Sequence, residues 1–321
     1  MMRKNIGLLF ITIVILLLAP FLGERYINIF SFLQEPDSLY ILFQYRVPRI
    51  MLAFLAGAGL SLSGMIFQSL FCNVLATPYT LGISTAASLG ALLAMSLGVT
   101  FNVWIFDQTV VFAILFSVLS LWSIYLISRR YAEGRMSDVL LVGVALNFLF
   151  TSLIMLVQFQ LDYLNAFKFM HWLFGSLRNV SYEVVIFELT VIFIAVTLVY
   201  LLRKELDLLS LGEEFAHSRG VNVSYVRWIL IIIGSVLIGS IVAFFGPIAF
   251  IGLIVPNIAR AIFGAVHKKL IFATLLIGGS MLVIADVLSR ALFAPVELPV
   301  GIFSSVIGAI FFCILVITRR H

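Results

Sequence analysis

The sequence predicts an all-α integral membrane protein with about ten transmembrane helices. Of its 321 residues, 63% are hydrophobic and 11% are charged, whereas a soluble domain is about half apolar. Backbone polar groups in a bilayer must be hydrogen-bonded within the chain, so long apolar segments are expected to be helices. Ten such runs occur, at residues 6–22, 50–71, 81–99, 109–128, 139–161, 184–202, 228–245, 248–262, 270–289 and 300–317, the eighth being the shortest.

The second apolar run differs from an ordinary lipid-facing span. It reads MLAFLAGAGLSLSGMIFQSL, with RVPRI before it and FCNVLATPYTLGIS after it. Its Gly, Ala and Ser residues let helix backbones approach closely. We therefore expect this helix to pack inside the protein, with both of its ends in functional contacts.

The connectors leave no room for a soluble domain, because none exceeds about 25 residues and such domains need 50 or more. We therefore treat residues 1–321 as a single transmembrane domain. An ATP-binding loop requires Gly-Lys followed by Ser or Thr, and none of the five lysines follows a glycine. The sequence predicts that the chain is not an ATPase, and that another chain supplies the energy.

The distribution of Lys and Arg predicts the orientation. With the N-terminus inside, most of the 20 basic residues lie on the cytoplasmic side, as the positive-inside rule requires. Both termini are then cytoplasmic, and the first run is read as an uncleaved helix because LLLAPFLGERY lacks a small-x-small cleavage site. The basic residues are scattered over loops, so nucleic-acid binding is not indicated. The basic residues on the outside would be Arg25, Arg46, Arg49, Lys168, Arg178 and Arg290.

Cysteine and histidine usage indicates neither a disulfide nor a metal site. Cys72 and Cys313 both fall near the predicted cytoplasmic face, which is reducing. The four histidines show no ligand spacing. We therefore expect no bound metal and no cofactor.

Residues 205–222 form an unusual connector. LDLLSLGEEFAHSRG interleaves apolar and charged residues, and Gly212 and Gly220 stand where short helices could begin and end. This pattern predicts two short helices against the membrane face. A solvated loop fits the pattern alone equally well.

Five segments together resemble a known family. They are RVPRI, NVLATPYTLGIS, LGEEFAHSRGV, GPIAFIGLIVPNIARAIFG and ADVLSRALFAPVELPVGIFSSVIGAIFF, and their order and spacing resemble the FecCD or BtuC-like permeases of bacterial iron-siderophore and cobalamin ABC importers. The resemblance runs from about residue 40 to the end. It implies the type II ABC importer permease fold in the bacterial cytoplasmic (inner) membrane.

The resemblance also implies partners and a substrate class. Two permease subunits, either two copies or a pair of paralogues, would form the pathway above two ABC ATPase subunits. A substrate-binding protein would dock on the outside. A ferric siderophore is the favoured substrate because that class dominates the family, with cobalamin or haem as alternatives.

The inner face carries the first set of residues implied by the resemblance. LGEEFAHSRGV matches the helices that couple the permease to its ATPase. Glu213 and Glu214 also suit a helix start through the helix dipole, which is their alternative role. The coupling residues would be Leu211, Gly212, Glu213, Glu214, Ala216, Ser218 and Gly220.

The outer face carries the second set. Arg46, Arg49 and Arg290 match family positions that meet glutamates of the binding protein, and a guanidinium presents a fork of donors to a carboxylate. The alternative is snorkelling of these arginines at the interface. Asp286 lies one helical turn before Arg290, so a structural pair is expected. Glu188 is expected to snorkel from the outer end of its span.

A cytoplasmic gate is the third element that the resemblance implies. NVLATP matches the family's NPLA-type turn and RMSDVLLVG its second constriction. The small and apolar side chains there can close a pore by dewetting. Val74 replaces the usual Pro and Asn257 the usual His, which are the two departures from the pattern. The gate residues would be Asn73, Leu75, Met136 and Ser137.

Two other classes of protein stay open. A proton-coupled secondary transporter could use Asp286 or Glu188, because acids inside the membrane are functional candidates. Such a transporter leaves the amphipathic segment from Leu206 to Gly220 without a purpose. A membrane structural protein or receptor leaves the arginines and the gate turns unexplained.

Overall fold

The structure is a computed structural model that describes residues 2–22, 36–98, 101–131, 136–177, 180–292 and 297–318. Almost all of these residues are helical. In chain order the elements are α1 (Met2–Leu18), η1 (Ala19–Phe21), α2 (Pro36–Ile41), η3 (Leu42–Arg46), α3 (Val47–Leu70), η4 (Pro78–Leu81), α4 (Ile83–Ser96), β1 (Asn102–Val103), β2 (Phe106–Asp107), α5 (Gln108–Tyr131), α6 (Met136–Gln160), α7 (Tyr163–Leu173), α8 (Tyr182–Leu201), α9 (Arg203–Leu209), α10 (Glu213–Ser218), α11 (Val223–Phe245), α12 (Ile251–Phe263), α13 (His267–Ala291) and α14 (Val300–Thr318).

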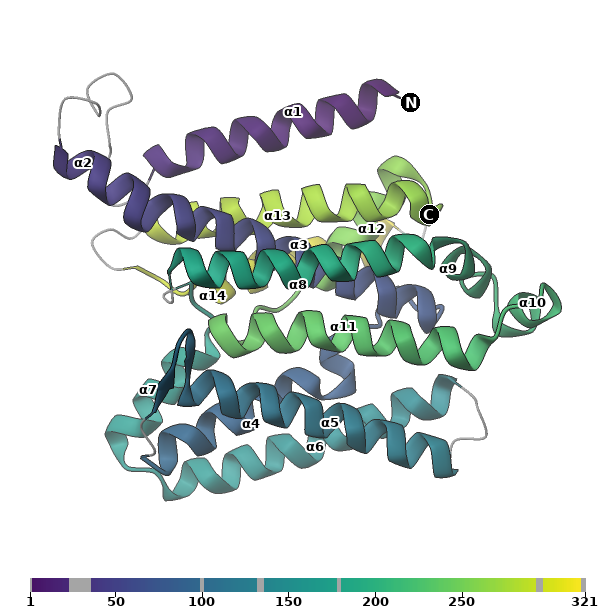
Figure 1. The fold of residues 1–321 in the computed structure, drawn as a ribbon, viewed down its shortest axis with the longest axis horizontal. Coiled ribbons are helices and arrows are strands. Elements are labelled where there is room, and N and C mark those ends of the chain that lie inside the picture. Colours follow the sequence, from purple (N-terminus) through teal and green to yellow (C-terminus); the bar gives the residue numbers. More distant parts are fainter. Residues whose placement is uncertain are drawn as a thin grey trace.

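The long helices lie side by side and define two ends of the molecule (Figure 1). Helices α9 and α10 project from one end, called the α10 end below. Helices α2 and α7 and the β1–β2 hairpin lie at the other, called the α7 end. Helix α1 begins and α14 ends at the α10 end, so both terminal helices have their free ends on the same side.

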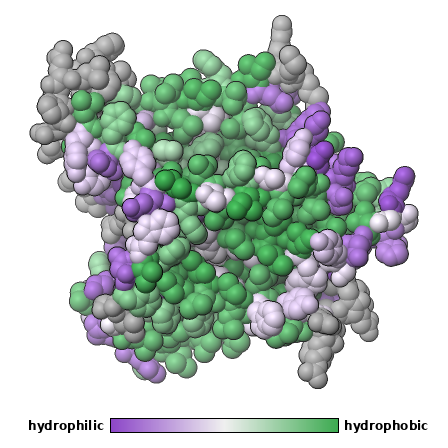
Figure 2. Space-filling model, in the orientation of Figure 1, coloured by the Kyte–Doolittle hydropathy of each residue, from purple (hydrophilic) through white to green (hydrophobic). Residues whose placement is uncertain are grey.

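Hydropathy divides the surface in the same direction. Figure 2 shows hydrophobic side chains across the middle of the molecule and hydrophilic ones toward both ends. Within the described residues, seven helices are long and apolar enough to cross a membrane, and α4, α12 and α14 are shorter apolar helices. These ten helices coincide with the ten predicted runs, which confirms the predicted fold class.

Helix α3 is the centre of the fold, as its small residues predict. It contacts α8, α11, α12 and α13, and nearly every residue from Ile50 to Leu70 is buried. A Cβ atom on Gly57 would lie 2.2 Å from the carbonyl oxygen of Gly278, and one on Gly64 would lie 1.8 Å from that of Gly252. Only glycine permits these two backbone crossings.

Several helix ends follow from local sequence. Ser181 accepts a hydrogen bond from the Val184 N–H at the start of α8, and Asn222 accepts one from Tyr225 at the start of α11. Both are preferred N-cap residues. Gly246 and Gly264 end α11 and α12 with φ of 72° and 87°, values that favour glycine.

Helix α7 lies outside the ten predicted apolar runs. Its eleven residues, YLNAFKFMHWL, are too few to cross a bilayer, which takes about 20. Instead α7 packs against α4. This helix covers the α7 end of the bundle formed by α4, α5 and α6 (Figure 1).

Candidate functional site

The α10 end contains the two short helices predicted for residues 205–222. Leu206 and Leu209 of α9 are buried, and Ala216 anchors α10 in the core. Gly212 has φ of 118° and Gly220 has φ of 82°, so both corners around α10 need a backbone that other residues rarely adopt. The chain therefore turns into and out of α10 through two glycine corners.

The predicted coupling residues divide into an exposed and an anchoring group. Leu211, Glu214, Ser218 and Gly220 are exposed. Ala216 is fully buried, so it supports α10 and is not itself available to a partner. Glu213 is half-buried, and its Oε1 atom lies 2.5 Å from Nη2 of Arg227 in α11.

A hydrogen-bonded relay joins α9 to α3. His267 Nδ1 lies 2.6 Å from Asp207 Oδ1, and the His267 backbone N–H donates to the same oxygen at 2.9 Å. On its other side, His267 Nε2 lies 2.7 Å from Ser69 Oγ. Residues from α9, α13 and α3 thus form one chain of contacts, called the Asp207–His267–Ser69 relay below.

The relay ends next to the predicted gate turn. Ser69 precedes Cys72, whose Sγ atom donates to the Leu209 carbonyl at 3.4 Å. Partial burial raises the pKa of the Cys72 thiol, and the charge of Glu213 raises it further. The thiol therefore stays protonated at neutral pH and donates this second link between α9 and the turn.

The predicted gate turn after α3 is internally ordered. Asn73 Oδ1 accepts the Leu75 N–H at 2.9 Å, and the Asn73 carbonyl accepts the Ala76 N–H at 3.1 Å. Asn73 and Leu75 are both exposed. The side chains of Met136 and Ser137, the other two predicted gate residues, lie outside the described residues.

The two departures from the family pattern contact each other. Asn257 Nδ2 donates to the Val74 carbonyl at 3.3 Å and to the Leu253 carbonyl at 2.8 Å. An amide at position 257 therefore ties α12 to the gate turn. Gln68 also connects α3 to α12. Its amide donates to the Leu253 carbonyl, and its Oε1 accepts from Arg260 at 2.5 Å.

The α7 end contains a buried ion-pair network. Asp286 is 0% exposed and lies between two guanidinium groups: Arg49 Nε is 2.9 Å from its Oδ1, and Arg290 Nη2 is 2.9 Å from its Oδ2. Arg49 Nη1 also lies 3.0 Å from Glu297 Oε2. Arg46 Nη1 donates to the Pro20 carbonyl at 3.0 Å.

This network changes the picture of the three predicted docking arginines. Arg46 and Arg290 are buried, and Arg290 Nη1 also donates to the Leu22 carbonyl at 3.3 Å. Arg49 keeps 15% of its side chain exposed, while Glu297 keeps 37%. The ionic surface at this point therefore consists of Arg49 and Glu297, with Asp286 holding the arginines from beneath.

Glu188 lies in the core, so the expectation that it snorkels is wrong. It is 0% exposed, and Ser240 of α11 donates to its Oε2 at 3.3 Å. Its other oxygen has no hydrogen-bond partner among the described residues. Its place one turn inside α8 could not reveal this burial, because the packing of α11 against α8 determines it.

Sequence reasoning missed Glu297, Asp207, His267 and Ser69. Each is joined to its partner across at least 60 residues of chain, so no local spacing reveals the contact. Glu297, Asp207 and Ser69 lie within segments quoted above, whereas His267 does not, and this position is the only signal in the sequence. In the described part of the chain, no group of three His, Cys, Asp or Glu residues is placed to hold a metal ion.

Comparisons with known proteins agree with this architecture. The model of the FecCD transport family matches residues 9–318. The Fe(3+)-citrate import system permease of Bacillus subtilis is 39% identical over 86% of this chain and 81% of its own length. The hemin transport system permease of Yersinia pestis is 32% identical over 99% and 97%.

A solved structure supports the same fold. It is described as an inward-facing conformation of a metal-chelate type ABC transporter, and it superposes on this chain with a TM-score of 0.90 at 29% identity, covering 99% of this chain and 100% of that one.

Proposed function

Because the chain belongs to the FecCD transport family, and is therefore a membrane transport subunit and not an enzyme, we propose that it carries an iron chelate of the ferric-siderophore class. The path would lead from the outside of the bacterial inner membrane into the cytoplasm. Its relatives include permeases named for Fe(3+)-citrate and hemin, which supports an iron-containing substrate. Cobalamin and haem stay as alternatives.

The proposed assembly places the ATPases at the α10 end. Two ABC ATPase subunits would bind beneath two permease chains, either two copies or a pair of paralogues. The observation that carries this proposal is the α9–α10 pair: it projects from the bundle, exposes Leu211 and Glu214, and connects through the Asp207–His267–Ser69 relay to the helix before the gate turn. Both termini would then be cytoplasmic.

The same proposal places a substrate-binding protein at the α7 end. Arg49 is the direct contact, because it is the one predicted docking arginine whose side chain is not fully enclosed. Arg46 and Arg290 would hold the surrounding backbone, through Pro20 and Leu22. Acidic groups on the partner would compete with Glu297 for the Arg49 guanidinium.

A proton-coupled secondary transporter finds less support. Asp286 contacts two guanidinium groups, so both of its oxygens hold arginines in place and serve a structural pairing. Among the residues that the structure describes, no cation pairs with Glu188, which is the remaining candidate for that alternative.

The test is uptake of iron(III) citrate into vesicles that contain the chain with its ATPase and binding protein. We expect uptake to stop when ATP is depleted while a proton gradient is maintained. Collapse of the gradient with ATP present should leave uptake unchanged. The reverse pattern would replace the importer with a secondary transporter, and the Glu188→Gln variant would then identify its proton site.

A further inference from the structure

A cavity of about 450 Å³ lies at the α7 end, apart from the coupling helices and the arginine network. Helix α7 forms one wall with Lys168 and Trp172, which are four residues apart and so share a helix face. The opposite wall has Asp107 at the end of β2 and Thr109 at the start of α5, and Phe244 belongs to the end of α11. Cavities of about 300–1,000 Å³ are the usual size for small-molecule sites.

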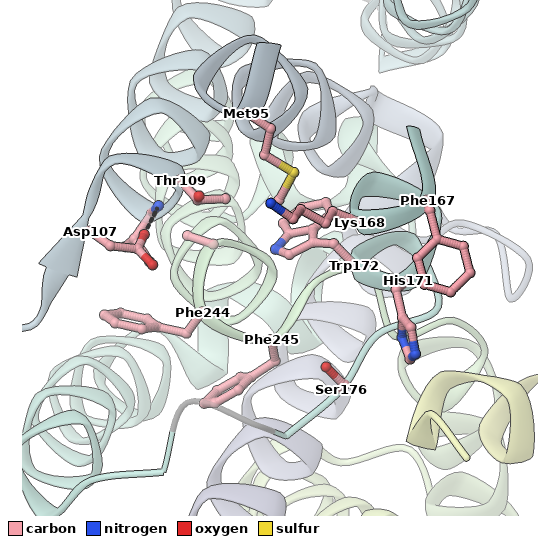
Figure 3. Close-up of a pocket in the computed structure, with 12 residues that line it drawn as sticks. Met95, Asp107, Thr109, Phe167, Lys168, His171, Trp172, Ser176, Phe244 and Phe245 are labelled. Atoms are coloured by element: carbon pink, nitrogen blue, oxygen red, sulfur yellow. Dashed lines mark hydrogen bonds between the residues drawn. The ribbon is translucent and has the colours of Figure 1, made fainter. Parts of the chain in front are cut away.

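The polar groups of this cavity are mostly donors without partners. The Lys168 ammonium, the Thr109 hydroxyl and the Trp172 indole N–H have no hydrogen-bond or ion-pair partner within the described ranges. Thr109 is 9% exposed and lines the cavity wall. Figure 3 shows Lys168 and Trp172 extending toward the side of the cavity where Thr109 lies.

The carboxylate of Asp107, the one acidic group among the described residues that line the cavity, is already engaged. Asp107 stands directly before α5, and its Oδ1 accepts the Val110 N–H at 2.8 Å, the dashed contact in Figure 3. A carboxylate at this position caps the helix and is stabilised by its dipole. Its negative charge is thereby partly offset, while Lys168 on the facing wall is not.

We propose that this cavity binds the anionic oxygens of a small oxygen-rich ligand between Lys168 and Thr109, with the body of the ligand against Trp172 and Phe244. The assignment of this ligand as the transported chelate rests on the proposed function. Carboxylate oxygens of an iron chelate would accept from the Lys168 and Thr109 donors, and the remainder of the chelate would contact the aromatic rings. A lipid headgroup offers phosphate oxygens of the same chemistry. The cavity thus adds a chelate-binding site within the permease itself.

The probe is radiolabelled iron(III) citrate, measured by equilibrium dialysis against the purified full chain in an uncharged detergent. We expect saturable binding that Lys168→Glu weakens by about tenfold or more, since a charge-assisted hydrogen bond is replaced by like-charge repulsion. Lys168→Arg should stay within about threefold of the unaltered chain because the cation is retained. Thr109→Val, which keeps the shape and removes the donor, should weaken binding several-fold.

The matched control is Lys204→Glu, which makes the same charge change at an exposed residue of the α10 end and should leave affinity unchanged. Lys168 is exposed, so its variants are expected to fold. Equal affinity in the unaltered chain and in Lys168→Glu overturns the proposal. So does equal loss in Lys204→Glu, which would show a general charge effect.

A second arm adds phosphatidylglycerol and measures retained lipid by native mass spectrometry. Lipid retained by the unaltered chain and lost in Lys168→Glu, without saturable citrate binding, keeps the anion site and overturns its assignment to a chelate. Citrate binding that phosphatidylglycerol does not reduce supports the chelate. No ATPase is present in either arm, so a failure of ATP-driven uptake would not alter these readings.

Discussion

The two ends of the molecule use charge in opposite ways. At the α10 end, Glu214 and Gly220 are exposed and Gly212 is half-buried, and the polar contacts lead inward through His267 and Ser69 to α3. At the α7 end, the Arg49 and Arg290 guanidinium groups both pair with Asp286, which is fully buried. A motif can therefore mark an exposed surface at one end and a buried support at the other, and only the contacts distinguish them.

The largest expected effect is on stability, at the α7 end. Asp286→Ala leaves Arg49 and Arg290 without their shared carboxylate, and breaking a buried ion pair costs about 3–5 kcal/mol. We expect a clear fall in the thermal unfolding temperature of the purified chain. Glu214→Ala, at the exposed α10 surface, is the matched control and should change little. Equal effects of the two changes would erase the contrast between the ends.

The next effect is on coupling, at the α10 end. Gly212→Val places a β-branched residue at φ of 118°, and such strain costs on the order of 1–3 kcal/mol. Because nothing lies within 4 Å of the added Cβ, the change should reorient α10 without disturbing the core. ATP hydrolysis should persist while uptake per ATP falls. Ser224→Val, at another exposed position, provides the comparison, and normal coupling in Gly212→Val would remove this corner from the mechanism.

The sequence predicted those features that depend on local pattern. The small residues of α3 predicted its burial, the glycines at 212 and 220 predicted two short helices, and the spacing of Asp286 and Arg290 predicted a pair. It did not predict that Arg49 shares Asp286, that Glu297 completes the network, or that Glu188 is enclosed. These contacts join α3, α8, α11 and α13, and helix packing determines them.

A smaller effect is expected from the relay. His267→Ala removes the contacts of both Asp207 and Ser69, and coupling energies between sites are about 1–3 kcal/mol. Uptake per ATP should fall several-fold. Lys268→Ala, at the neighbouring exposed residue, should not reduce it.

A double-mutant cycle separates transmission from simple destabilisation. If the relay transmits, Asp207→Ala and Ser69→Ala should reduce uptake per ATP by amounts that do not add, because either change interrupts the same chain. Additive losses that follow the unfolding temperature would assign His267 a structural role only.

The smallest effect concerns Glu297, and its sign decides how the α7 end meets its partner. Glu297→Gln removes the charge that accompanies Arg49 at the surface and leaves Asp286 in place to hold the arginine. If acidic groups of the binding protein pair with Arg49, loss of the competing Glu297 charge should make this variant bind that protein about two- to fivefold more tightly. The reason is that an exposed ion pair contributes about 0.2–1 kcal/mol. Rising salt should reduce the gain, because exposed charges are screened. If Glu297 itself meets a basic group, the same variant should bind more weakly.

Arg49→Lys separates the cases further, because Lys retains the charge but lacks the fork that contacts Asp286 and Glu297 together. The measurement is the affinity of the binding protein for both folded variants at two salt concentrations. An affinity unchanged in both variants would show that this end supports the fold and does not dock the partner through Arg49.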